Sequence, residues 1–538
     1  MRNTPMGIVH RSSKAFNATR HGGSPILLLG LLFMALLLRL YTIGTKTVWL
    51  DEAFSIWLAN QPLFAMWRWL VQIDQHPPLY YTLLHGWQWL FGDLQGPVRL
   101  LSALCSTLTI PFFYYAGRRL FDQPTAILAT VILATAPFHV RYAQEARMYA
   151  LLTLTVAIAL YLLTWLLLDN TERQPRWLWT AYGLAQAAVM LTHNTAAVFF
   201  PLAVNLAIGG AVLRLHLRGG ISALIALNRP GFERRWLRTQ LLAFVVWLPW
   251  SIPFIIQSIG VAREFWISFP TGYEIYETLH TFHLAHQPYT PIPWLIGDLL
   301  YWLLGIAGAW TLRRRGALLS LLLALFFVPI LGELVVSLRR PIFSDRTLIW
   351  TTLPYYLLVA VGIRQVGRWY AGMGWMKRRG ATPRFSVFLL ILVVALNVQA
   401  LINYYRYFSK EGWDEAAAHV ATYIEPGDLI LFNATWVQLP FDYYFRHFAS
   451  GHDTRIARHG VPVDLFDRNV LEPKMHATDL PRLQQLLTGH RRIWLIYSHD
   501  WYTDPQGLIP RELAQQHLLA AEEHFRGVRV LFYVDQHR

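Results

Sequence analysis

Residues 25–40 read PILLLGLLFMALLLRL and form the first of many almost uncharged runs in the chain. Of the 538 residues, 54% are hydrophobic and only 15% are charged, whereas soluble domains carry about 25% charged residues. Several runs reach about 18 residues or more, enough for a helix to cross about 30 Å of hydrocarbon. The run at 25–40 follows a basic segment without a small-residue cleavage site, so we expect a retained helix. The sequence therefore predicts a polytopic α-helical membrane protein.

The sequence predicts about eleven membrane-spanning helices from the length and composition of its apolar runs. They cover residues 25–44, 97–117, 124–141, 148–168, 177–192, 194–213, 239–257, 292–312, 316–337, 347–364 and 385–403. Clusters of Lys and Arg lie between the runs, and all six clusters are cytoplasmic if the N-terminus is cytoplasmic. We therefore expect insertion in the cell (inner) membrane with an extracytoplasmic C-terminus. These clusters account for the net charge of +15, so that charge does not indicate nucleic-acid binding.

The chain is expected to divide into a membrane domain, residues 1–403, and an extracytoplasmic α/β domain, residues 404–538. The first extracytoplasmic loop covers about residues 45–96. Its apolar segment at 76–92 would reach only about 23 Å as a helix, and counting it as a crossing would invert every later basic cluster, so we expect an interfacial helix. In the α/β domain the pattern predicts helices at 415–424 and 512–525 and strands at 429–432, 492–497 and 528–534.

An acidic pair, Asp51 and Glu52, follows the first predicted helix within VWLDEAFS, residues 48–55. Acidic side chains at the membrane edge are unfavourable unless they are paired or used. A carboxylate there is suited to remove the proton of an acceptor hydroxyl. The alternative is that Asp51 caps a helix beginning at Glu52, where acidic residues favour the helix dipole.

The first loop also contains HPPLYY, residues 76–81. Proline is frequent at the first positions of a helix, so one interpretation is a helix start with interfacial aromatic residues. The other is that His76, held by two rigid prolines, contacts a phosphate or sugar oxygen.

Ionisable residues crowd the predicted outer turn between the third and fourth crossings, where Arg141, Glu145 and Arg147 lie close together. Arg141 and Glu145 have the spacing of a helical ion pair. Arginine on the extracytoplasmic side departs from the usual excess of basic residues in cytoplasmic loops. An anionic lipid phosphate would explain this departure, because guanidinium binds phosphate in a planar fork. The same reasoning applies to Arg339, Arg340 and Arg346 in a later outer loop, with snorkelling to lipid headgroups as the alternative.

The sequence does not predict a tightly bound metal or a nucleotide site. Cys105 is the only cysteine, and we find no metal-ligand spacing around His193 and Asn194 or in the loop with Arg263, Glu264, His283 and His286. A loosely held divalent ion at Asp51 or Glu52 stays open. The chain lacks a phosphate-binding glycine-rich loop and a nucleophile elbow, which argues against ATP-driven transport.

Four motifs in order carry a resemblance to a known family. They are WLDEAFS at 49–55, HPPLYY at 76–81, RLLSA at 99–103 and QEARMY at 144–149. With them the chain resembles the bacterial protein-mannosyltransferase-like membrane glycosyltransferases, which are relatives of the dolichyl-phosphate-mannose protein mannosyltransferases and of the lipid A aminoarabinose transferase. The resemblance is strong over about residues 25–160 and weak in the C-terminal region.

The resemblance implies a C-type glycosyltransferase fold that transfers a sugar from a polyprenyl-phosphate donor to a protein, lipid or glycan acceptor outside the cytoplasm. It implies Asp51 as the catalytic base and Glu52 as its partner. His76 stands where some relatives have a basic residue before proline, and the segment DRT at 345–347 stands where relatives often have Arg-Tyr. The donor and phosphate site implied in this way comprises His76, Tyr80, Glu145, Arg147, Tyr149 and Arg346.

Two alternatives belong to other functional classes. A basic and aromatic outer cavity would also suit a transporter or flippase for a lipid-linked glycan, although transporters place ionisable residues near the membrane midplane and often contain inverted repeats. An assembly scaffold without activity would leave the acidic pair and the arginines without a role. The position of the charges at the outer edge favours the enzyme.

Overall fold

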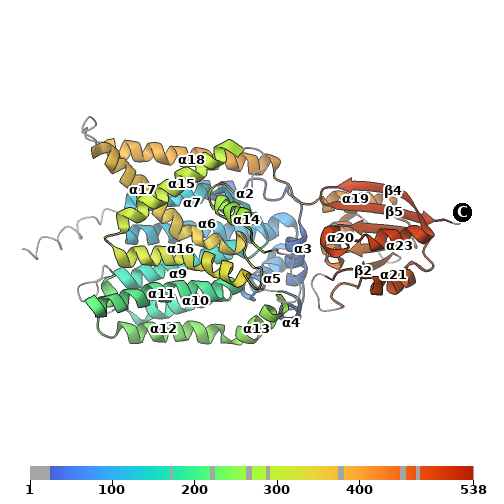
Figure 1. The fold of residues 1–538 in the computed structure, drawn as a ribbon, viewed down its shortest axis with the longest axis horizontal. Helices are drawn as coiled ribbons and strands as arrows, with labels where there is room; N and C mark the ends of the chain where they lie inside the picture. Colours follow the sequence, from blue (N-terminus) through green and yellow to red (C-terminus); the bar gives the residue numbers. More distant parts are fainter. Residues whose placement is uncertain are drawn as a thin grey trace, which may run out of the picture.

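The computed structural model describes most of the chain in nine segments. They cover residues 25–74, 76–169, 174–218, 224–261, 269–285, 291–372, 381–448, 456–467 and 473–536. The long helices form a bundle, and a small domain with a β-sheet lies at one end of this bundle (Figure 1). We refer to residues 25–407 as the helical domain and to residues 413–536 as the sheet domain.

Helices coincide with every predicted crossing in the helical domain. They are α2 (Pro25–Leu40), α6 (Gln95–Leu120), α7 (Gln123–Thr135), α8 (Pro137–Ala143), α9 (Tyr149–Leu168), α10 (Arg176–Met190), α11 (Asn194–Arg218), α12 (Phe232–Trp247), α13 (Ser251–Val261), α14 (Gly272–Leu284), α15 (Pro291–Leu312), α16 (Gly316–Ser337), α17 (Thr352–Gly372, after the 3-10 turn η3, Arg346–Thr351) and α18 (Ala381–Tyr407). Of these, α14 was not predicted.

Within the described residues, eight helices are long and apolar enough to cross a membrane, or nine if the pair α7 and α8, bent by 54°, forms one crossing. Helix α2 has 16 residues and α10 has 15, so each is shorter than a full crossing of about 20 residues. The count of eleven crossings therefore stays a prediction.

Helices α15 and α17 pack backbone against backbone. A Cβ atom on Gly308 would lie 1.9 Å from the carbonyl oxygen of Leu358, and one on Gly362 would lie 1.8 Å from that of Leu304. Only glycine allows this approach, which is the usual reason for small residues at helix contacts in membranes. The contact fixes α17, and with it the turn η3 that precedes it.

The first loop forms three short helices, α3 (Leu50–Ala59), α4 (Leu63–Ile73) and α5 (Leu79–Phe91). They lie at the end of the bundle that faces the sheet domain (Figure 1). Helix α5 corresponds to the predicted interfacial helix at 76–92. Helix α3 begins at Leu50 after Trp49 as its N-cap residue, so the interpretation of Asp51 as the cap of a helix beginning at Glu52 is wrong.

The sheet domain contains one five-stranded sheet of order β2-β1-β3-β5-β4. The parallel strands are β1 (Leu429–Asn433), β2 (Ala457–Val461) and β3 (Arg492–Tyr497), and the antiparallel strands are β4 (His517–Phe525) and β5 (Val528–Asp535). The helices are α19 (Trp413–Tyr423), α20 (Gln438–Phe448), α21 (Leu480–Leu487), α22 (Asp500–Thr503) and α23 (Leu508–Gln516). Separate apolar clusters cover the two faces of the sheet, one around Trp413 and Phe441 and one around Leu483 and Leu513.

One predicted element of the sheet domain is wrong. The helix expected at 512–525 ends at Gln516, and residues 517–525 form the edge strand β4. This segment reads HLLAAEEHF, and Leu, Ala and Glu favour helices in isolation. Pairing with β5 overrides that preference, since strand formation depends mainly on neighbouring strands. The predicted helix at 415–424 and the strands at 429–432, 492–497 and 528–534 correspond to α19, β1, β3 and β5.

Candidate active site

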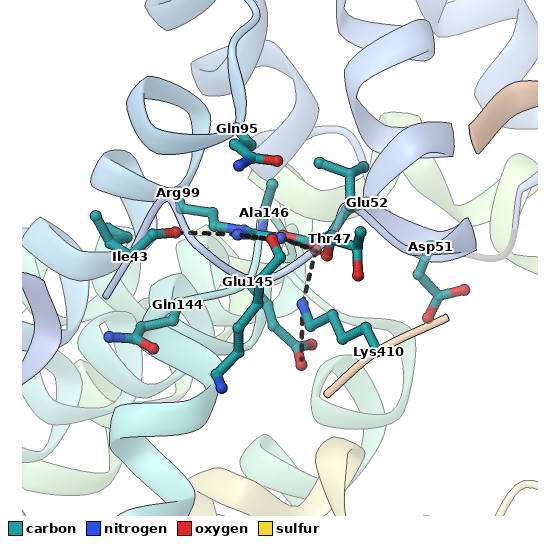
Figure 2. A network of polar contacts seen from close by, with 12 residues as sticks. Ile43, Thr47, Asp51, Glu52, Gln95, Arg99, Gln144, Glu145, Ala146 and Lys410 are labelled. Carbon is teal, nitrogen blue, oxygen red and sulfur yellow. Dashed lines mark hydrogen bonds and ion pairs between the residues drawn. The ribbon is translucent and has the colours of Figure 1, made fainter. Parts of the chain in front are cut away.

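Helix α3 directs its two adjacent acidic residues into different surroundings. Successive residues on a helix do not share a face, and the side chain of Glu52 is fully buried whereas that of Asp51 is 26% exposed. Figure 2 shows Asp51 pointing away from the polar network that surrounds Glu52. The two carboxylates therefore have different partners.

Glu52 is the centre of a buried network of charges (Figure 2). It accepts hydrogen bonds from Arg99 of α6 at 2.7 and 2.8 Å, from Lys410 at 2.7 Å and from the backbone N–H of Ala146 at 2.8 Å. Burial opposes the charge of this carboxylate, but Arg99 and Lys410 outweigh burial and lower the pKa of Glu52 to about 2. Glu52 is therefore a fixed anion that holds together the first loop, α6 and the linker before the sheet domain.

Asp51 is held by two arginines from distant parts of the chain. Its Oδ2 accepts a hydrogen bond from Arg346 Nη1 at 2.7 Å and lies 3.9 Å from Arg147 Nε. Arg147 also donates to Ser55 Oγ at 3.3 Å and to Tyr81 Oη at 3.2 Å. Burial alone would raise the pKa of Asp51, but the charges of Arg147 and Arg346 outweigh it and lower this pKa below its ordinary value.

Asp51 and both arginines line a cavity of about 340 Å³. A wall of aromatic rings continues from them: the rings of His76 and His193 lie 5.2 Å apart, and those of His193 and Tyr149 lie 6.0 Å apart. His76 Nδ1 lies 2.9 Å from Asp74 Oδ1. Burial and the cations nearby lower the pKa of His193 well below its ordinary value, so this ring is neutral at physiological pH.

The rest of the cavity combines an apolar side with a further cation. Val198 and Phe199 of α11, Phe254 of α13 and Val336 of α16 provide the apolar surface. Arg340, just after α16, also lines the cavity and donates to the carbonyl oxygen of Ser258 at 2.5 Å. Such a mixture fits a ligand with an anionic head and an apolar tail.

The sheet domain also contributes to the wall of the cavity. Trp436 and Leu439, which follow strand β1, are among the lining residues. The ring of Trp436 lies edge to face with that of His499, at 4.9 Å, and His499 Nε2 lies 3.3 Å from Glu411 Oε1 in the linker. The cavity therefore lies between the two domains, and both contribute to its walls.

Five of the eight residues expected at the site line this cavity: Asp51, His76, Arg147, Tyr149 and Arg346. The other three, Glu52, Tyr80 and Glu145, are buried behind it.

Glu145 lies 3.6 Å from both Arg141 Nε and Lys410 Nζ. The spacing of Arg141 and Glu145 thus indicated a real contact, although one in the interior. Sequence reasoning did not single out Lys410 or Trp436, and no local motif marks them.

His283, which the sequence singled out, is not among the described residues that line the cavity. His283 is buried in α14 and its Nδ1 lies 2.7 Å from Asp298 Oδ1, with the ring stacked on that of Tyr301. His286, Arg263 and Glu264 lie outside the described residues. Among the residues that the structure describes, no group of three or more His, Cys, Asp or Glu side chains is arranged to hold a metal ion.

Comparisons with known proteins show similarity in sequence and in fold. Residues 75–228 match the sequence model of the dolichyl-phosphate-mannose-protein mannosyltransferase family. The chain is 27% identical over 330 residues, 57% of its length, to undecaprenyl phosphate-alpha-4-amino-4-deoxy-L-arabinose arabinosyl transferase 1 of Pseudomonas fluorescens. It is 28% identical over 188 residues, 33% of its length, to the corresponding transferase of Pseudomonas paraeruginosa. These matches cover 55% and 30% of the two relatives, so the chain spans about half the length of the first one.

Solved structures extend the likeness to nearly the whole chain. The apo structure of ArnT from Cupriavidus metallidurans superposes with a TM-score of 0.59 and 15% identity, over 95% of this chain and 98% of that one. The chain resembles the protein-mannosyltransferase-like membrane glycosyltransferases and has their fold. The apo oligosaccharyltransferase of Archaeoglobus fulgidus shares this fold, with a TM-score of 0.55, 11% identity and coverage of 97% and 75%.

The resemblance expected from the four motifs is therefore confirmed, as is the C-type membrane glycosyltransferase fold with a small C-terminal sheet domain. The chain, which resembles these glycosyltransferases, is a multi-pass membrane protein. Its cavity lies at the end of the bundle beside the sheet domain, which is where the motif residues Asp51 and Arg147 meet.

Proposed function

We propose that the protein is a membrane glycosyltransferase that moves a sugar from a polyprenyl-phosphate donor to an acceptor hydroxyl on the extracytoplasmic face. One observation carries this proposal: a single cavity holds the carboxylate of Asp51 beside the guanidinium groups of Arg147 and Arg346. A carboxylate suits proton removal from the acceptor. Guanidinium groups suit a phosphate on which charge develops.

The reaction that fits these groups is one direct displacement. The acceptor oxygen forms a bond to the anomeric carbon of the sugar, and its proton passes to Asp51. At the same time the bond between the anomeric carbon and the phosphate oxygen breaks, and the polyprenyl phosphate leaves with a second negative charge. Arg147 and Arg346 stabilise that charge, which is larger in the transition state than in the bound donor.

The donor class is supported by the names of the similar proteins. The two relatives are arabinosyl transferases named for an undecaprenyl phosphate-linked sugar, and ArnT from Cupriavidus metallidurans has been solved with undecaprenyl phosphate bound. The apolar wall formed by Val198, Phe254 and Val336 gives a polyprenyl chain a surface to lie against.

We further propose that the sheet domain helps to bind or select the acceptor, which is a protein, a lipid or a glycan. Trp436 and Leu439 bring this domain to the cavity that contains Asp51. They follow the carboxyl end of β1, beside the parallel strand β3, which is the place where open α/β sheets bind ligands.

The proposed orientation places the N-terminus in the cytoplasm and the sheet domain outside it, in the cell (inner) membrane. The basic clusters between helices support this orientation. Replacing the exposed Trp501 by cysteine, in a chain whose Cys105 is changed to alanine, allows labelling of intact cells with a membrane-impermeant thiol reagent. If the reagent labels this cysteine only after membrane disruption, the sheet domain is cytoplasmic and the proposed orientation is wrong.

The function is tested with purified protein in lipid bilayers and radiolabelled polyprenyl-phosphate sugars, with cell-envelope fractions as acceptors. We expect transfer by the wild type and by the loop control Asp93→Asn, and loss of transfer by Asp51→Asn at equal thermal stability. Binding of the lipid without transfer from any donor would instead favour the transporter or flippase.

A further inference from the structure

The carboxylate proposed as the base is not ready to accept a proton in this structure. Asp51 Oδ2 accepts a hydrogen bond from Arg346 Nη1 at 2.7 Å, and a second guanidinium, that of Arg147, lies 3.9 Å away. A carboxylate paired with two cations is a weak base, because protonation would discard both interactions. The lowered pKa of Asp51 reflects the same pairing.

The cations that pair with Asp51 are also those available to a phosphate. Among the described residues that line the cavity, the arginines are Arg147, Arg340 and Arg346. Arg340 is bound to the carbonyl oxygen of Ser258. A phosphate that binds Arg147 or Arg346 therefore competes with Asp51 for that guanidinium group.

The two arginines differ in exposure. Arg147 donates to Ser55 Oγ, to Tyr81 Oη and to the backbone oxygen of Asp51, and its side chain is 5% exposed. Arg346 stands at the start of η3 with a side chain that is 16% exposed and donates to Asp51 Oδ2. Arg346 is therefore the more accessible of the two to a ligand.

We propose that Arg346 is a switch that couples donor binding to activation of the base: it pairs with Asp51 before the donor binds and turns to the donor phosphate when the donor binds. This inference rests on the proposed function and adds an order of events to it. The acceptor hydroxyl meets a competent base only after the donor is in place. Before the donor binds, Asp51 stays paired and does not act on water or acceptor.

The proposed coupling can be tested by a binding measurement that requires neither the acceptor nor the sugar. Undecaprenyl phosphate is added to the full-length protein in nanodiscs, and its dissociation constant is measured for the wild type and for Asp51→Asn. We expect Asp51→Asn to bind the lipid about tenfold more tightly, equivalent to about 1.4 kcal/mol, because Arg346 no longer has to leave a carboxylate.

A matched control separates competition from a general change of charge. Asp74 also lines the cavity, and its Oδ1 lies 2.9 Å from His76 Nδ1. We expect Asp74→Asn, which removes the same charge, to change the dissociation constant less than about threefold. Equal tightening by the two variants, or no tightening by Asp51→Asn, would overturn the switch.

A spectroscopic readout follows the carboxylate itself. Infrared difference spectra of protein with isotope-labelled aspartate are recorded with and without undecaprenyl phosphate. We expect a carboxylate band that shifts on lipid binding, that is absent in Asp51→Asn and that is already shifted without lipid in Arg346→Gln. A band that stays in place while the wild type binds the lipid would contradict the switch. If the wild type does not bind undecaprenyl phosphate at all, the proposed donor class fails and the switch fails with it.

Discussion

Lys410 Nζ lies 2.7 Å from Glu52 Oε2, although 358 positions separate the two residues. Lys410 belongs to the linker between α18 and α19, and Glu52 belongs to the first helix of the first loop. Both side chains are almost completely buried. This contact ties the sheet domain to the helix that carries Asp51, so the position of the outer wall of the cavity depends on it.

Removing the amine of Lys410 is expected to destabilise the protein strongly. Glu52 keeps its pairing with Arg99 but loses a buried hydrogen bond from a charged donor, which contributes about 1.5–3 kcal/mol. Lys410→Met should therefore lower the free energy of unfolding by about 2 kcal/mol, measured by denaturant titration in micelles. Arg446→Gln is the control, because Arg446 pairs with Asp93 across the same two regions but is 42% exposed. A loss below about 1 kcal/mol is expected there, and an equal loss in both variants would contradict the assignment.

Substitutions of Asp51 and of Glu52 should affect different properties, the transfer rate in one case and the stability in the other. Asp51→Asn is expected to reduce the transfer rate about 10²–10⁴-fold, the usual contribution of a positioned base, with an unchanged unfolding temperature. Glu52→Gln is expected to lower the unfolding temperature, because it leaves Arg99 and Lys410 without their shared anion. Thermal unfolding and initial rates are measured on the same preparations. An unstable Asp51→Asn or a fully stable Glu52→Gln would reverse these roles.

Trp436 is expected to affect the acceptor and not the donor. Trp436→Phe keeps an aromatic ring but shortens the wall of the cavity, and we expect the KM for the acceptor to rise about tenfold, the effect of losing about 1.4 kcal/mol. The KM for the donor should stay the same. Trp501→Phe serves as the control, since Trp501 lies on the same domain and is exposed. A rise in the donor KM alone would place Trp436 on the donor side.

Glu411 should make the stability of the protein depend on pH. Burial raises the pKa of Glu411 from 4.5 to about 7, so between these values the folded state binds more protons than the unfolded state. Stability from this group is present at low pH and is lost as the pH rises toward about 7. The pKa of His499 is lowered mainly by burial, which gives the opposite slope.

The comparison of wild type with Glu411→Gln isolates the contribution of Glu411. Thermal midpoints are measured from pH 5 to pH 8, and the wild type is expected to lose stability relative to Glu411→Gln across the lower part of this range. Parallel curves for the two proteins would show that Glu411 is not protonated in the folded state.

The sequence predicts those parts of the fold that depend on local pattern. Apolar runs mark the helices because a membrane requires long uncharged segments, and the short motifs mark Asp51, His76 and Arg147 because charged and aromatic residues stand out at the membrane edge. The approach of Lys410 and Trp436 to the site depends on how the sheet domain docks, and no local pattern records that. Strand β4 was missed for the same reason, since its conformation is set by pairing with β5.

The contact between Gly308 and Gly362 limits how far this chain can diverge. Even a methyl group at either position would collide with a carbonyl oxygen of the facing helix, and those oxygens belong to backbone that cannot rotate aside. Homologues that keep this helix pair are therefore expected to retain both glycines while the apolar residues around them exchange. The two positions offer a signature for recognising distant members whose overall identity has become too low for alignment.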